Sequence, residues 1–241
     1  GRGNPPGEGD FAVGGEQCGV VEAGATGDEA AAGVVVAAAL IFAANGTVGY
    51  MTTGGYIQNY ATDPAGLALE RGDILWAVTA SAAVWLCTTA FAGWVSDYIG
   101  RRRTYLIGFV VQAIGAGILF PLVNSASLGL LYVALIFLTV GLGLTYGAQS
   151  AMYAELYPAS VRASGVSISY AIGSILGGAF APMIAASLVD ATGTTVAVTI
   201  YLVTASLVGF TAILLLQERK GIPLSPDFET EQSKSPFIFG K

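Results

Sequence analysis

The chain has 241 residues, of which 54% are hydrophobic and 11% are charged, and its formal net charge is -6. An average soluble domain carries about 25% charged residues, so this composition excludes an ordinary water-soluble fold and indicates a membrane protein. Histidine is absent from the sequence, which excludes imidazole catalysis and histidine metal ligation.

The first segment, residues 1–30, is rich in Gly, Ala and Glu and has neither helical nor alternating periodicity. We therefore expect a disordered acidic leader. Its six acids and the single base Arg2 supply -5 of the net charge. The segment lacks the basic start and compact apolar stretch of a secretory signal peptide. Because it begins with Gly instead of Met, a non-native origin of this leader is one interpretation.

Six apolar blocks follow, and each is long enough for a helix to cross a hydrocarbon core of about 30 Å. The sequence therefore predicts an all-α membrane domain over residues 31–216, followed by a cytoplasmic tail over 217–241. The predicted spans are about 33–58, 74–95, 104–123, 127–150, 164–188 and 194–216.

Small residues and one proline mark how these helices pack. The fourth span contains Gly143 and Gly147, and the fifth contains Gly173 and Gly177, each pair in Gly-x-x-x-Gly spacing. That spacing favours close contact between helices in lipid. Pro182 lies inside the fifth span and predicts a kink, because proline removes a backbone hydrogen bond and clashes with the preceding turn.

Basic residues between the spans predict the orientation. Of the basic residues in the loops and next to the last span, only Arg71 falls on one side of the membrane. The other side carries Arg101, Arg102, Arg103, Arg162, Arg219 and Lys220. The positive-inside rule then places both termini and the arginine loops in the cytoplasm of a multi-pass cell-membrane protein.

A charged motif, Gly93-Trp94-Val95-Ser96-Asp97-Tyr98-Ile99-Gly100-Arg101-Arg102-Arg103, follows the second span. Gly93 permits close helix packing, Gly100 permits a tight reversal, and Asp97 lies within reach of the arginines. A simpler interpretation is that the arginines only enforce topology and bind lipid headgroups.

The ordered motif resembles the signature of the major facilitator superfamily, G-x-x-x-D-[RK]-x-G-R-[RK], with Tyr98 at the first basic position. In that family the loop forms cytoplasmic salt bridges that hold one state of the alternating-access cycle. The resemblance therefore implies a gating role for Gly93, Asp97, Gly100, Arg101 and Arg102.

A second motif follows the fourth span and reads Glu155-Leu156-Tyr157-Pro158-Ala159-Ser160-Val161-Arg162-Ala163-Ser164-Gly165. It looks like the loop between the tenth and eleventh helices of facilitator transporters. The resemblance places Glu155 and Arg162 in a second charged cluster on the same cytoplasmic face. The alternative is a local surface ion pair between them, worth about 0–1 kcal/mol.

Two further stretches resemble helices of the metabolite:proton symporter branch. Residues 165–182 resemble its eleventh helix, and its seventh helix is similar to Ala43-Ala44-Asn45-Gly46-Thr47. Its members carry organic acids, shikimate-like compounds, or proline and betaine. The resemblance covers about residues 33–220. It implies that the chain is the C-terminal six-helix half of a twelve-helix carrier, built from two inverted three-helix repeats, whose N-terminal half is a missing partner.

Substrate contacts in that half would come from uncharged polar and aromatic side chains near mid-depth, because the family lines its cavity with the first, second, fourth and fifth helices. The alternative role for each is an interhelical hydrogen bond or an aromatic-belt position. The candidates are Asn45, Tyr50, Trp85, Tyr146, Gln149, Tyr170 and Ser174.

None of the predicted spans contains an Asp, Glu, Lys or Arg away from its ends. A proton-coupled carrier normally needs a titratable group at membrane depth. Either the coupling carboxylate belongs to the other half, or the chain performs no proton coupling.

We therefore predict a secondary active transporter, a proton-coupled symporter of a small organic acid or zwitterionic metabolite, whose partners are this substrate, protons and the lipid bilayer. An inactive fragment lacking its N-terminal half and, less favoured, a six-span channel are the alternatives, although no charged pore-lining ring is visible. The spans hold no catalytic constellation, so we expect no enzyme. We expect no cofactor, metal or nucleic-acid partner, and Cys18 and Cys87 lie in settings too different for a disulfide framework.

Overall fold

The structure is a computed structural model, and it describes residues 25–52, 55–63, 67–234 and 236–238. Residues 1–24, most of the predicted leader, lie outside this part of the chain. The leader was predicted to be irregular up to residue 30, but the first helix already begins at Ala25.

Six helical segments in the described part are long and apolar enough to cross a membrane, which confirms the all-α prediction. Four of them are single helices: α3 (Arg71–Ile99), α4 (Arg101–Val123), α5 (Leu128–Leu156) and α8 (Val196–Leu215). The first segment consists of α1 (Ala25–Thr52) and α2 (Tyr56–Thr62), and the fifth of α6 (Arg162–Ser174), η1 (Ile175–Ala179) and α7 (Ala181–Thr192).

The fifth segment is interrupted just before Pro182. A π-helical turn, η1, occupies 175–179, and α7 restarts at Ala181 with Pro182 in its first turn. Proline is tolerated there because its missing N–H has no helical partner in a first turn. The predicted kink is therefore present, as a break with a π-turn on its N-terminal side.

The main helix contacts follow an internal symmetry. The helix α5 packs along α3 and α4, α1 packs along α6 and α8, and α4 packs against α8. If the first segment is exchanged with the fourth, the second with the fifth and the third with the sixth, each of these contacts becomes another contact of the same set. Because each group has three spans, an odd number, the two groups run in opposite directions through the membrane, as expected for inverted repeats.

Glycines set the closest of these contacts. A Cβ on Gly147 of α5 would lie 2.4 Å from the Thr89 carbonyl oxygen of α3, and a Cβ on Gly177 of η1 would lie 2.1 Å from the Ala43 carbonyl oxygen of α1. Both glycines thus allow two backbones to touch, as their Gly-x-x-x-Gly spacing predicted.

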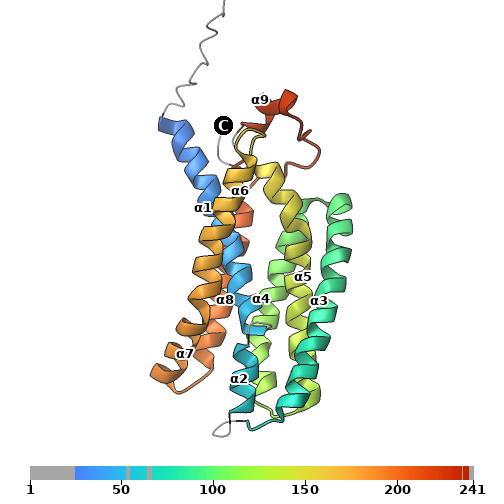
Figure 1. The fold of residues 1–241 in the computed structure, drawn as a ribbon, viewed down its shortest axis with the longest axis vertical. Helices are drawn as coiled ribbons and strands as arrows, with labels where there is room; N and C mark the ends of the chain where they lie inside the picture. Colours follow the sequence, from blue (N-terminus) through green and yellow to red (C-terminus); the bar gives the residue numbers. More distant parts are fainter. Residues whose placement is uncertain (1–24, 53–54, 64–66, 235, 239–241) are drawn as a thin grey trace, which may run out of the picture.

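The two ends of the bundle differ in the charged residues that they carry. We call the end with Arg101, Arg102, Arg103 and Arg162 the arginine end, and the opposite end, with α2 and the last turn of α7, the far end. Beyond α8, residues 216–234 and 236–238 cover part of the arginine end through η2 (Pro226–Phe228), α9 (Glu229–Gln232) and a β-bridge between Leu216 and Phe237 (Figure 1).

Candidate functional site: a charge cluster and a groove

The first motif forms the junction between α3 and α4. Gly100 separates the two helices with φ of 101°, a backbone conformation that favours glycine. A Cβ at this position would also lie 2.6 Å from Oε2 of Glu218. Gly93 lies about two helical turns before this junction, where its carbonyl accepts a hydrogen bond from Ser96 Oγ at 2.8 Å. The glycines of the motif therefore serve packing and the turn.

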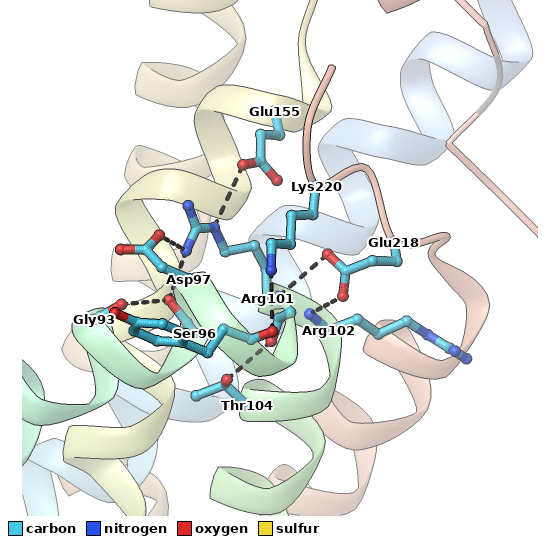
Figure 2. A network of polar contacts seen from close by, with 11 residues as sticks. Gly93, Ser96, Asp97, Arg101, Arg102, Thr104, Glu155, Glu218 and Lys220 are labelled. Atoms are coloured by element: carbon cyan, nitrogen blue, oxygen red, sulfur yellow. Dashed lines mark hydrogen bonds and ion pairs between the residues drawn. The ribbon is translucent and has the colours of Figure 1, made fainter. Parts of the chain in front are cut away.

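Arg101 is the centre of the charge cluster (Figure 2). Its Nη1 donates to Asp97 Oδ1 and, at 2.8 Å, to Ser96 Oγ, while its Nε lies 3.4 Å from Glu155 Oε1. The Asp97 side chain is 61% exposed, but that of Glu155 is 11% exposed. One guanidinium thus ties the α3–α4 junction to the last turn of α5.

Glu218 was not among the predicted site residues, yet it completes this cluster. Its carboxylate accepts the backbone N–H groups of Arg101 at 3.2 Å and Arg102 at 3.0 Å, so it caps the N-terminus of α4. In return, the Arg102 side chain donates to the carbonyl oxygens of Ile213 at 3.3 Å and Leu214 at 2.9 Å, at the C-terminus of α8. Opposite charges therefore face both helix ends, where unpaired backbone groups and the helix dipole favour them.

Arg162 belongs to a separate network. Its Nη2 donates to Gln232 Oε1 at 3.0 Å and its Nη1 to the Leu224 carbonyl at 3.1 Å, while Gln232 Oε1 also accepts the Ala159 N–H at 2.9 Å. No ion pair joins Arg162 to Glu155 among the described residues, so the alternative interpretation, a local ion pair across that turn, does not hold. The two residues also do not form one second cluster, because Glu155 belongs to the cluster around Arg101. The reason is that Glu155 points to Arg101, while Arg162 points to the C-terminal segment.

Arg219 is buried and anchors the C-terminal segment to the end of α5. Its guanidinium donates to the carbonyl oxygens of Gln232 at 2.7 Å, Lys234 at 3.1 Å and Leu156 at 3.4 Å. Burial lowers the pKa of Arg219, and the nearby Glu155 carboxylate opposes this effect. The sequence showed Arg219 only as a topology signal, because its acceptors are carbonyl groups, which carry no sequence signature.

A capping role for Glu218 predicts a modest loss of stability. Glu218→Gln should lower the free energy of unfolding by about 1 kcal/mol, because the charged cap of two amides is lost. That corresponds to a fall of about 2–4 °C in the midpoint of thermal unfolding in detergent. Glu231→Gln is the matched control, since Glu231 is an exposed acid of the same segment whose carboxylate makes no hydrogen bond to the described residues. Equal melting of the two variants would contradict the capping role.

A groove of about 300 Å³, which we call the mid-depth groove, opens between α1, α3, α5 and the α6–η1 segment. Four predicted cavity residues line it: Tyr50, Trp85, Tyr146 and Ser174. Phe42, which no sequence motif marks, also lines the groove. The centre of its ring lies 4.5 Å from that of Tyr170 and 6.5 Å from that of Tyr146. Gly46, Gly49 and Gly178 leave the space open. The groove is therefore lined mainly by aromatic side chains and glycines. Tyr170, also a predicted cavity residue, is not among the lining residues but contacts Phe42.

Asn45 and Gln149 were also predicted to line the cavity, but both are fully buried between α1 and α5. Asn45 Nδ2 donates to Gln149 Oε1 at 3.5 Å, and Asn45 Oδ1 has no hydrogen-bond partner in the described part of the chain. Their position corrects the prediction: Asn45 occupies the face of α1 that packs on α5, while Gly46 and Gly49 face the groove. The hydrogen bond between these two buried side chains satisfies each amide group in part.

Comparisons with known proteins agree with this architecture. The sequence profile of the Major Facilitator Superfamily matches residues 31–239. The chain is 35% identical over 185 residues to the inner membrane metabolite transport protein YhjE of Escherichia coli, covering 76% of this chain and 41% of that protein. It is 29% identical over 199 residues to the ectoine/proline transporter ProP of Corynebacterium glutamicum, covering 82% and 39%.

A third relative is the alpha-ketoglutarate permease of Escherichia coli, with 31% identity over 185 residues, covering 75% of this chain and 41% of the permease. The chain therefore spans about two fifths of the length of the curated relatives that it matches.

Proposed function

The chain belongs to the major facilitator superfamily, and from this premise we propose that it is the C-terminal half of a secondary active transporter for a small metabolite. The observation that carries the proposal is the mid-depth groove, which lies beside the contact surface of α1 and α5 and is lined by rings and small residues. Alternating access requires such a site near the membrane midplane, at the interface between repeats.

The proposed substrate is a small organic acid or a zwitterion, taken up together with protons. Two of the three named relatives are, by their names, transporters of ectoine and proline or of alpha-ketoglutarate, which are molecules of this size and polarity. The six acids between residues 31 and 216 lie in loops or in the outer turns of helices. In this proposal the proton-binding group therefore belongs to the other six-helix half, which is the partner of this chain.

We also propose that the arginine end faces the cytoplasm of a cell-membrane protein, because positively charged loops are retained there. In this orientation the charge cluster around Arg101 lies on the cytoplasmic side, where it holds α3, α4 and α5 together in one state of the transport cycle. The cluster would have to open when the cytoplasmic ends of the helices move apart.

A direct test is reconstitution into liposomes with an inward proton gradient and radiolabelled organic acids and betaines. We expect uptake by a full-length transporter that contains this chain, and none by the chain alone. Uptake by the chain alone would contradict the need for a second half. Uptake that is indifferent to the proton gradient would contradict symport. Passive flux of many unrelated solutes would favour a channel instead.

The gating role predicts that Asp97→Asn lowers the initial uptake rate of the full-length transporter by about tenfold, within the usual range for coupling between conformational states. Stability should change little, because an ion pair with one partner 61% exposed contributes about 0–1 kcal/mol. Asp73→Asn, at the far end, is the control. Unchanged uptake by the Asp97 variant would leave the motif with a role in topology only.

Arg162→Ala tests whether the second network takes part in the same transition. We expect slower uptake with normal membrane insertion, and the double variant with Asp97→Asn shows whether the two networks are coupled. Because Arg162 and Arg101 share no contact among the described residues, coupling would have to pass through the C-terminal segment. Strictly additive effects on the logarithm of the rate would show that they act independently.

A further inference from the structure

A second groove, of about 450 Å³, lies at the far end of the bundle between α2 and α7. Its lining residues include Tyr56, Asn59, Tyr60, Asp63 and Asp190. It shares no lining residue with the mid-depth groove. Along the chain, however, the mid-depth groove is lined from residues 42–50 and 174–178, and the second groove from 55–63 and 182–190. The second groove is thus the next stretch of the same helix pair toward the far end, where α2 and α7 end (Figure 1).

Two tyrosine rings form one side of the second groove. The rings of Tyr56 and Tyr60 are nearly parallel, with an interplanar angle of 4° and centroids 6.4 Å apart. Phe120 supports both from behind, with its ring edge-on to them at 6.3 Å and 5.6 Å. Tyr60 is also fixed by its hydroxyl, which donates to Asn124 Oδ1 at 2.8 Å. Both rings are therefore held in place, and both tyrosines, which are partly buried, line the groove.

Two carboxylates also line the second groove. Asp63 and Asp190 line the groove from α2's C-terminal end and from α7, and both side chains are exposed. The charged residues described at the far end are four acids, Asp63, Glu70, Asp73 and Asp190, and one base, Arg71, a formal charge of -3. No base is among the residues that line the groove. A concave site of one sign raises the local concentration of oppositely charged solutes.

We infer that this groove is a binding site for an organic cation, specifically a quaternary ammonium group or the cationic end of a zwitterion. Aromatic faces attract such a group through the ring quadrupole, and the two carboxylates that line the groove supply negative charge. A small, strongly hydrated alkali ion gains less from tyrosine faces, so methylated ammonium is the favoured class. The site would hold a solute at the far end of the bundle, before or after the solute passes through the mid-depth groove.

The test uses the purified chain in a neutral detergent without ammonium headgroups and tetramethylammonium chloride as the probe. Binding is followed by saturation-transfer NMR of the probe's methyl signal. We expect saturable binding in the millimolar range, and none of the neutral analogue tert-butyl alcohol at the same concentrations. Absence of tetramethylammonium binding, or equal binding of the neutral analogue, overturns the inference.

Variants separate the two components of the site. Tyr56→Leu should weaken tetramethylammonium binding by about fivefold, whereas Tyr56→Phe retains the ring and should bind like the parent chain. Asp190→Asn should also weaken binding, and Asp73→Asn, at the same end but outside the groove, should not. Binding that is unchanged in Tyr56→Leu and in Asp190→Asn would overturn the assignment to this groove.

This measurement is independent of the proposed transport activity, because it needs neither a gradient nor the other half of the transporter. Tetramethylammonium binding by the chain, together with no uptake by the full-length transporter, would support the site and contradict the transporter proposal. Uptake without binding would support transport and overturn the site.

Discussion

Gly177→Ala should lower the free energy of unfolding by about 3 kcal/mol. The new methyl group would lie 2.1 Å from the Ala43 carbonyl oxygen, so the α6–η1–α7 segment must move away from the backbone of α1. Overpacking usually costs about 1–3 kcal/mol, and we expect the upper end because the obstructing atom belongs to a helix backbone, which cannot rotate away as a side chain does. The measurement is the thermal unfolding midpoint in detergent.

The neighbouring glycine provides the control. A Cβ on Gly178 would have no atom within 4 Å, so Gly178→Ala should leave stability unchanged or raise it slightly through better helix propensity. Fluorescence-detected size exclusion should show both variants inserted and monodisperse before heating. If the two variants melted at the same temperature, the close contact between η1 and α1 would be wrong.

Arg101→Ala has the second largest expected effect, a loss of about 2 kcal/mol. It leaves the Glu155 carboxylate, 11% exposed, without its closest cation. Breaking a fully buried pair costs about 3–5 kcal/mol. We expect less here because Asp97 is largely exposed and because the Arg219 charge also acts on Glu155. The midpoint of thermal unfolding should fall by about 4–8 °C.

Two further variants separate this mechanism from a general loss of charge. Arg103→Ala removes an exposed arginine of the same loop and should change stability by less than about 0.5 kcal/mol. Adding Glu155→Gln to Arg101→Ala should recover part of the loss, because the amide carries no buried charge. A double variant less stable than Arg101→Ala alone would show that Glu155 has another essential partner.

The sequence predicted the number of spans and their approximate positions, because charges are costly in hydrocarbon and the apolar blocks are long. It underestimated the length of α3 and α5 at the arginine end, where the helices continue to Ile99 and Leu156. The hydropathy of the sequence falls several residues before these helices end. The polar ends of both helices extend beyond the apolar blocks, and the charge cluster forms on these extensions.

The candidate site was predictable only in part. Four of the seven proposed cavity side chains line the groove, but the sequence could not show which face of α1 meets α5, and so it misplaced Asn45 and Gln149. Glu218 was missed for a different reason. Capping of a helix by a side chain 116 residues away depends on where the chain returns, and a glutamate after an apolar block is otherwise an ordinary surface residue.

The sequence by itself thus determined the class of the protein, its helical spans, the glycine pairs that bring backbones together and the motifs of its family. These features depend on local composition and spacing, since the energies that favour them act within one helix or between a helix and lipid. The tertiary structure alone decided that Arg101 serves Glu155 while Arg162 serves Gln232, and that tyrosines of α2 and an aspartate of α7 share one groove. These groups meet only after the helices pack, because their contacts join residues far apart in the chain.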